Sequence, residues 1–289
     1  MGKGDFIPAL YELQTKQISR ANPLAQHQRT SWPILDCIDN LTVLPMRSIP
    51  LPSNTRLFNE AFSWTEFPRL FLHAPDLLTQ ARGNGERVLV FPGFGAGDFS
   101  TLILRNYLGY LGYNSAGWQQ GVNMGDVMAM IDQLTRAVRK EAERTQQPLI
   151  LIGWSLGGYL AREVARELPG MVSQVLTMGS PIIGGPKYTR VAALFKSSGM
   201  SLDMIEQAIE VRDQVPLTLP ITNIYSKNDG VVAWEACMDH KSPAVEHFEV
   251  NATHLGLGIS ADVFRIVARQ LGKNLAAQNL STGSISPAV

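Results

Sequence analysis

Residues 148–158 read Pro-Leu-Ile-Leu-Ile-Gly-Trp-Ser-Leu-Gly-Gly, an apolar run that ends in the pattern Gly-x-Ser-x-Gly around Ser155. An amphipathic segment follows at residues 159–168, so the pattern predicts a strand, a sharp turn and a helix. This order is typical of a nucleophile elbow, in which a strained turn holds a serine with its hydroxyl exposed. We expect glycine to be required at Gly153 and Gly157, because neighbouring backbone leaves no room for a Cβ there.

The composition is that of a globular protein without a strong charge. The chain has 289 residues, in which 25 lysines and arginines balance 25 aspartates and glutamates. This length can bury a large core without disulfides or metals, and the charge balance gives no reason to expect nucleic acid as a partner. The N-terminus lacks the apolar region of a signal peptide, and no apolar run reaches the ~20 residues that span a bilayer. We therefore expect a soluble, cytoplasmic protein.

The distribution of prolines and apolar residues predicts three regions. Residues 1–55, rich in proline and polar residues, are expected to form an N-terminal extension, and residues 56–277 the ordered domain. Two short helices, broken near Pro68 and Pro75, are expected at the start of this domain. Residues 278–289 are expected to be a flexible C-terminal tail.

Apolar runs bounded by turn residues predict the strands of a sheet. The runs lie at 87–91, 114–118, 149–152, 172–178, 219–226 and 245–250. Helical periodicity predicts helices at 101–110, 126–147, 159–168, 202–211 and 261–274. We expect Asp98 to cap the first of these helices. Strands that alternate with helices predict an α/β fold, in which helices cover both faces of a mainly parallel sheet.

A nucleophilic serine needs an adjacent base, and the position of His254 suits that role. In a sheet of this kind, catalytic groups lie on loops beyond the carboxyl ends of the strands. His254 follows the strand predicted at 245–250, whereas His247 lies inside that strand and His240 precedes it. The other two histidines precede the sheet. We therefore predict that His254 is the general base.

Asp229 is predicted to orient His254. It lies in the turn at residues 227–230, beyond the carboxyl end of the strand predicted at 219–226, and a triad needs an acid that holds the imidazole in one tautomer. The chain order Ser155, Asp229, His254 is the order serine, acid, histidine of one hydrolase class. Because Asp-Gly is also a common turn pair, three other acids remain alternatives: Asp203, Asp213 and Asp239.

Two backbone amides are predicted to form an oxyanion hole. One belongs to Leu156, directly after the serine, and the other lies in the glycine-rich loop after the first predicted strand, where Phe94 is the expected donor. The same loop is similar to the start of a dinucleotide fingerprint, but Asp98 stands where the third glycine would be. No histidines and cysteines are spaced for a metal site, and Cys37 and Cys237 are too far apart in sequence for a redox motif.

Together these motifs resemble the α/β-hydrolase superfamily, in particular its esterase-like and lipase-like members. The resemblance rests on four segments and extends over roughly residues 85–275: Gly153-Trp-Ser-Leu-Gly-Gly158, the Asp229 turn, Thr253-His-Leu-Gly256 and the loop at Pro92. Many lipase-like members carry His-Gly in the oxyanion loop, where this chain has Pro92-Gly93. A backbone donor tolerates this change, although it makes Phe94 less well defined than the other site residues.

The resemblance implies a serine hydrolase that cleaves carboxylic esters through an acyl-enzyme, without metal or cofactor. It also implies a lid or cap insertion at residues 180–218, whose apolar side chains either line an acyl pocket or serve only as packing. With Phe94 and Trp154 near the serine, a medium or long acyl chain is favoured. Candidate substrate-binding residues are Trp154, Ile182 and Ile183. The expected partner is a small-molecule or lipid ester, and transient contact with a membrane surface stays open. The alternatives are acyl transfer to an alcohol, thioester cleavage, and a binding protein without turnover.

Overall fold

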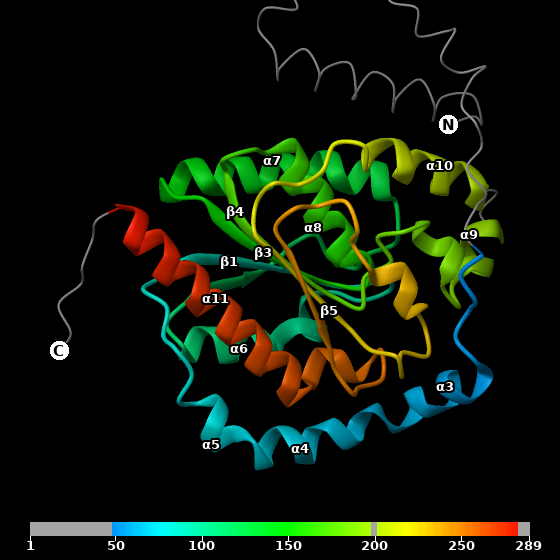
Figure 1. Cartoon of the computed structure of the whole chain (residues 1–289), viewed down its shortest axis with the longest axis horizontal. Helices are drawn as coiled ribbons and strands as arrows, with labels where there is room; N and C mark the ends of the chain where they lie inside the picture. Colours follow the sequence, from blue (N-terminus) through cyan, green and yellow to red (C-terminus); the bar gives the residue numbers. More distant parts are fainter. Residues whose placement is uncertain (1–47, 198–200, 283–289) are drawn as a thin grey trace, which may run out of the picture. The chain divides into compact units, whose positions relative to one another are not determined.

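Six parallel strands form one sheet at the centre of the described structure. The computed structural model describes residues 48–197 and 201–282, and within them the strand order is β2-β1-β3-β4-β5-β6 (Figure 1). The strands are β1 Arg87–Phe91, β2 Asn114–Gly117, β3 Leu149–Trp154, β4 Val172–Met178, β5 Ile221–Tyr225 and β6 Val245–Glu249. Each strand begins and ends within two residues of its predicted bounds.

Helices cover both faces of this sheet, as predicted. The helices α6 Leu102–Tyr110 and α11 Ala261–Thr282 pack on one face, and α7 Val127–Thr145 and α8 Leu156–Glu167 pack on the other (Figure 1). All of these elements belong to one compact unit, Pro50–Val289. The predicted N-terminal extension lies largely outside the described residues.

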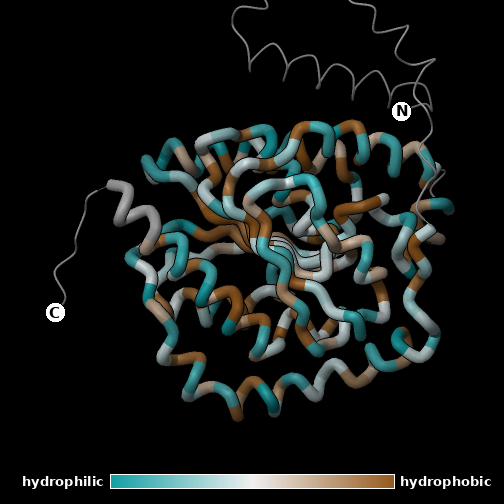
Figure 2. The backbone as a smooth tube through the Cα atoms, in the orientation of Figure 1, coloured by the Kyte–Doolittle hydropathy of each residue, from teal (hydrophilic) through white to brown (hydrophobic). Residues whose placement is uncertain are grey.

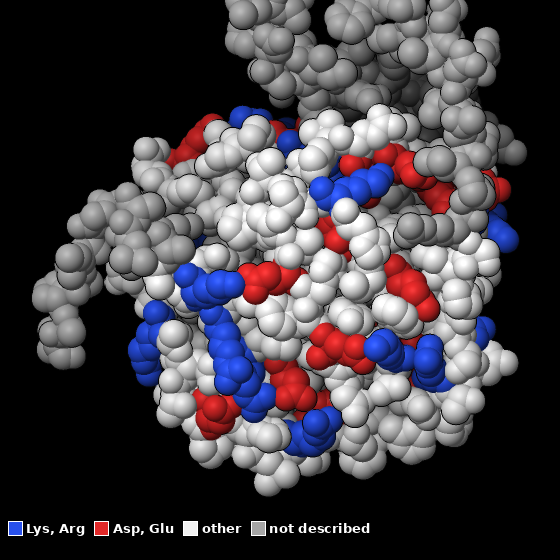
Figure 3. Space-filling model, in the orientation of Figure 1, with Lys and Arg blue, Asp and Glu red and all other residues white. Residues whose placement is uncertain are grey.

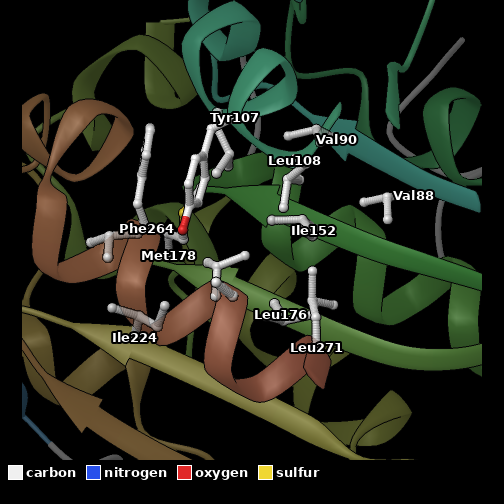
Figure 4. Close-up of a cluster of buried hydrophobic side chains, with 14 of the residues drawn as sticks. Val88, Val90, Tyr107, Leu108, Ile152, Leu176, Met178, Ile224, Phe264 and Leu271 are labelled. Atoms are coloured by element: carbon white, nitrogen blue, oxygen red, sulfur yellow. The ribbon is translucent and has the colours of Figure 1, made fainter. Parts of the chain in front are cut away.

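Alternate strand residues supply two hydrophobic layers, because successive side chains of a strand point to opposite faces. In β1, Val88 packs with α6 and α11, whereas Leu89 packs with α7 and α8. Figure 4 shows the first layer, in which the rings of Tyr107 and Phe264 stack with their centroids 5.3 Å apart. In Figure 2 hydrophobic residues colour much of the central strands, whereas hydrophilic and hydrophobic residues alternate along the outer helices. Each buried leucine or phenylalanine stabilises the fold by roughly 1.5–3 kcal/mol.

Ten further helices among the described residues precede the sheet, lie in its connections or follow its last strand. They are α3 Asn54–Asn59, η2 Glu60–Thr65, α4 Glu66–Leu72, α5 Ala74–Leu77, η3 Asp98–Thr101, η4 Gly185–Tyr188, α9 Ala192–Ser197, α10 Leu202–Arg212, η5 Trp234–Cys237 and η6 Gly256–Ile259.

The helical segment before the sheet has boundaries near both Pro68 and Pro75, as predicted, but it forms four short helices rather than two. Pro68 lies in the first turn of α4, and Pro75 lies in the first turn of α5. The first amides of a helix have no partner within the helix, so a proline without an N–H is tolerated there. Both prolines therefore lie near the start of a helix.

Two further expectations are corrected. The carboxylate of Asp98 does not cap a helix, because it accepts hydrogen bonds from the amides of Trp118 (2.9 Å) and Gln119 (3.2 Å) at the end of β2. The closing helix α11 continues to Thr282, so the first residues of the expected tail are helical. No glycine or proline occurs between Lys273 and Thr282 that would end the helix earlier.

The surface carries mixed charges and several exposed aromatic side chains. Acidic and basic side chains lie interspersed on the face shown in Figure 3. In the segment from α3 to α5, the exposed large apolar side chains include Phe58, Trp64, Phe71 and Leu72. Among the described residues, no helix combines the length and apolar character that spanning a bilayer requires.

Candidate active site

Ser155 lies on a strained turn between β3 and α8. Its backbone has φ 55° and ψ −126°, a conformation with positive φ that residues other than glycine rarely adopt. Such a conformation costs of order 1–3 kcal/mol and persists only where the surroundings enforce it. Here the Ser155 amide donates to the Met178 carbonyl at the end of β4 (2.8 Å), and the Ser155 carbonyl accepts from the Gly158 amide (3.0 Å).

Close backbone packing explains the glycines on both sides of the serine. A Cβ at Gly153 would lie 2.3 Å from the Gly157 carbonyl oxygen, and a Cβ at Gly157 would lie 2.3 Å from the Phe91 carbonyl oxygen in β1. Backbone atoms cannot move aside as a flexible side chain can, so both positions exclude a side chain. This confirms the expectation that both glycines are required.

His254 and Asp229 form a buried pair. Nδ1 of His254 lies 2.7 Å from Oδ2 of Asp229, and the two residues are 5% and 2% exposed. Asp229 belongs to the acid loop, defined here as residues 226–232 after β5, and His254 belongs to the histidine loop, residues 250–256 after β6. A carboxylate only accepts hydrogen bonds, so Nδ1 carries the proton and Nε2 is left as a base.

Asp229 is itself held in place. Its Oδ1 accepts from the backbone amides of Val231 (2.8 Å) and Val232 (2.7 Å), which leaves Oδ2 to face the imidazole. The other aspartates that the sequence left open pair with cations instead: Asp203 with Lys187, Asp213 with Arg166 and Asp239 with Arg162.

The surroundings of His254 favour its charged form. Burial disfavours the imidazolium, but the charge of Asp229, the hydrogen bond that His254 donates to that carboxylate and the charge of Glu60 outweigh the burial, so the pKa of His254 lies above its ordinary value. A base with a raised pKa accepts a proton more readily.

Residues next to Ser155 contact the histidine loop. The indole Nε1 of Trp154 donates to the His254 carbonyl (3.2 Å), and the two rings lie with their centroids 6.0 Å apart. Gly179 follows Met178, whose carbonyl accepts from the Ser155 amide. A Cβ at Gly179 would lie 3.1 Å from Asp229 Oδ2 and 3.2 Å from His254 Nδ1. The structure thus brings the ends of β3, β4, β5 and β6 together around one site.

The oxyanion loop, residues 92–97, lies against the serine. A Cβ at Gly93 would be 3.1 Å from the Cβ of Ser155. The predicted oxyanion donor, the amide of Phe94, belongs to the next residue along the chain. Asn123, fully buried, fixes this loop: its side chain donates to the Pro92 carbonyl (3.0 Å) and its carbonyl accepts from the Gly95 amide (2.7 Å). No sequence signal marked Asn123, because its partners lie about thirty residues away in the chain.

The three candidate substrate-binding residues have different surroundings. Trp154 supports the histidine loop as described above. Ile182 is buried and Ile183 partly buried, and the Ile183 amide donates to the Ala236 carbonyl of η5 (2.9 Å). An aromatic contact joins the oxyanion loop to α9, since the rings of Phe94 and Phe195 lie 5.5 Å apart.

Glu60, which the sequence did not mark, is buried beside the histidine loop. Its carboxylate accepts hydrogen bonds from the amides of Gly230, His254 and Leu255, each 2.8 Å long. These partners lie 170 to 195 residues away along the chain. A single glutamate in an aromatic segment has no spacing rule that would predict such contacts.

A cavity of about 270 Å³ lies away from this site. Its lining includes Gln147, Ile150, Ser173 and Gln174, at the amino ends of β3 and β4, whereas Ser155 lies at the carboxyl ends. This cavity therefore lies at the opposite end of the strands from Ser155 and is not assigned a role in the proposed reaction.

Comparison with known proteins agrees with the fold. Residues 104–245 match the Thioesterase domain family. A structure of the metagenome-derived lipolytic enzymes LipS and LipT is 18% identical with a TM-score of 0.53, covering 68% of this chain and 96% of that one. A thioesterase domain from the curacin biosynthetic pathway is 13% identical with a TM-score of 0.44, covering 66% and 93%. Among curated protein sequences, none matches this chain significantly.

Proposed function

Because this chain has the α/β-hydrolase fold, as the sequence resemblance predicted, we propose that it is a serine hydrolase that cleaves acyl esters. The pairing of His254 with Asp229, 2.7 Å apart on the loops beyond two neighbouring strands, carries this proposal. Ser155 on its strained turn is the nucleophile of the proposed triad.

The proposed reaction has two halves. His254 Nε2 takes the hydroxyl proton as Ser155 attacks the ester carbonyl, and the amides of Phe94 and Leu156 bind the oxyanion. The protonated His254 then gives this proton to the departing alcohol, which leaves an acyl group on Ser155. In the second half, His254 takes a proton from water, the water cleaves the acyl-enzyme, and Ser155 regains its proton. Asp229 stabilises the imidazolium in both halves.

Thioester cleavage is the second candidate function, and the match of residues 104–245 to the Thioesterase domain family favours it. The same residues serve both reactions, since a thiolate leaves in place of an alkoxide. The acyl part of either substrate is proposed to be a medium or long chain. Support comes from the apolar contact of Phe94 with Phe195 beside the oxyanion loop.

Labelling and turnover together test this function. A fluorophosphonate probe is expected to label Ser155, because only an activated serine displaces fluoride from it. A series of p-nitrophenyl esters from C2 to C12, run beside acyl thioesters of coenzyme A, is expected to show hydrolysis that rises with chain length beyond acetate. Absence of labelling at Ser155 would rule out the triad. Activity that falls steadily beyond acetate would contradict an apolar acyl pocket.

The pH dependence of hydrolysis follows from the environment of His254. The free enzyme needs neutral His254, so kcat/KM is expected to rise with pH as this residue loses its proton. Since the pKa of His254 is raised, the midpoint of this acid limb is expected above the ordinary value of 6.5. The measurement is kcat/KM for one ester between about pH 5 and 9. A midpoint at or below the ordinary value would contradict the electrostatic argument.

A further inference from the structure

The carboxylate of Glu60 joins the two loops that carry the proposed acid and base. Oε1 accepts from the amides of both Gly230 and His254, and Oε2 accepts from the amide of Leu255, each at 2.8 Å. Gly230 directly follows Asp229 in the chain. A single oxygen of Glu60 therefore links the backbone next to Asp229 to the backbone of His254. Glu60 is 7% exposed, and the two oxygens of its carboxylate suit three amide donors, because they accept hydrogen bonds.

We propose that Glu60 is a positioning residue, which holds the histidine loop and the acid loop together so that His254 and Asp229 stay paired. This inference rests on the proposed serine hydrolase function. It means that a segment before the sheet, from α3 to α4, completes a site whose triad comes entirely from the sheet loops. Glu60 does not touch the reacting atoms and acts through the backbone of the base.

Two glycines show that this segment lies directly on the loops. A Cβ at Gly230 would lie 2.4 Å from the Arg56 carbonyl oxygen and 2.8 Å from the Leu57 Cα in α3. A Cβ at Gly256 would lie 3.2 Å from Cγ of Glu66 in α4. These two contacts, one with backbone and one with a side chain, are independent of the hydrogen bonds of Glu60, and they place the same segment against both loops.

The charge of Glu60 also acts on His254. Two carboxylates act on the charge of the imidazole, that of Asp229 from the acid loop and that of Glu60 from η2, and both raise the pKa of His254 against the effect of burial. Glu66, six residues further on at the start of α4, pairs instead with Arg69 at 2.9 Å. Glu60 therefore favours the imidazolium that forms during the reaction.

The test compares Glu60→Gln with a control in the same segment. Glu60→Gln keeps the shape but removes the charge and turns an amide nitrogen toward a backbone donor. We expect kcat/KM to fall about 10- to 100-fold, mostly in kcat, and the acid limb to move to lower pH because the pKa of His254 falls. Glu66→Gln removes a buried carboxylate that pairs with Arg69 rather than with loop amides, and its acid limb is expected to stay in place.

Two measurements need no turnover and separate this proposal from the proposed function. In NMR titrations the pKa of His254 is expected to be lower in Glu60→Gln than in the parent. The amides of Gly230, His254 and Leu255 are expected to exchange hydrogen faster. An inactive parent would refute the hydrolase while these two results still decide the role of Glu60. An unchanged pKa of His254 together with unchanged amide exchange would overturn the positioning role.

A second variant covers the case in which Glu60→Gln does not fold. Glu60→Asp keeps the charge on a side chain one methylene shorter, so the acid limb is expected to stay close to that of the parent while kcat falls. A Glu60→Asp enzyme with the kcat of the parent would overturn the claim that the three hydrogen bonds position the base.

Discussion

Ser155→Ala is expected to lower kcat by at least about 10⁴-fold, whichever acyl substrate is used. Without the hydroxyl no acyl-enzyme can form, and the oxyanion amides and substrate binding retain only about 10³ to 10⁴ over the reaction in water. The fold is expected to survive, because alanine only shortens the side chain. Measurement requires single-turnover or initial-rate kinetics with the best substrate of the series, together with fluorophosphonate labelling.

Ser173→Ala is a suitable control for this experiment. Ser173 donates from Oγ to the Leu149 carbonyl (3.3 Å) at the amino ends of the strands, far along the sheet from Ser155. Its variant is expected to keep both turnover and labelling. If Ser155→Ala retained the activity of the parent, another nucleophile would have to be sought.

Gly157→Ala is expected to destabilise the protein by more than about 4 kcal/mol, a loss large enough to prevent folding. The added Cβ would lie 2.3 Å from the Phe91 carbonyl oxygen and 2.6 Å from the Pro92 carbonyl oxygen. Relief of this clash would require α8 to move away from β1, which would also open the layer of buried side chains between them. Soluble yield and the free energy of unfolding in urea are the measurements.

The matched control is Gly109→Ala in α6. A Cβ at Gly109 would meet nothing within 4 Å, so the change is expected to stabilise the helix by up to about 1 kcal/mol. The pair separates the effect of packing from that of helix propensity, because both substitutions place alanine inside a helix. Equal unfolding midpoints for the two variants would refute the packing argument at Gly157.

Local pattern was enough to predict the sheet and its helices. Each strand is a short apolar run between turn residues, and the helices follow their own period, so the two patterns rarely conflict. Errors arose where a residue has two uses. Asp98, for example, can cap a helix or accept hydrogen bonds at the end of a neighbouring strand. Sequence alone does not choose between them, since tertiary contacts decide.

The residues of the candidate site also fall into those that the sequence could predict and those that it could not. His254 and Asp229 could be placed because topology puts them beyond the ends of strands, where parallel sheets gather their loops. Glu60 and Asn123 could not, because each acts by binding backbone groups, and any sequence can supply a backbone amide or carbonyl. When two side chains bond to each other, as His254 and Asp229 do, both residue types can be sought in the sequence. When a side chain bonds to distant backbone, as Glu60 and Asn123 do, the sequence shows only one of the two partners.

The central position of β1 in the sheet determines which part of the chain could fold as an isolated fragment. β1 pairs with both β2 and β3, and it comes from residues 87–91, outside the stretch 104–245 that matches the Thioesterase domain family. Without β1, the edges of β2 and β3 would face each other across an empty strand position with unpaired backbone groups. We therefore expect that residues 104–245 do not fold by themselves.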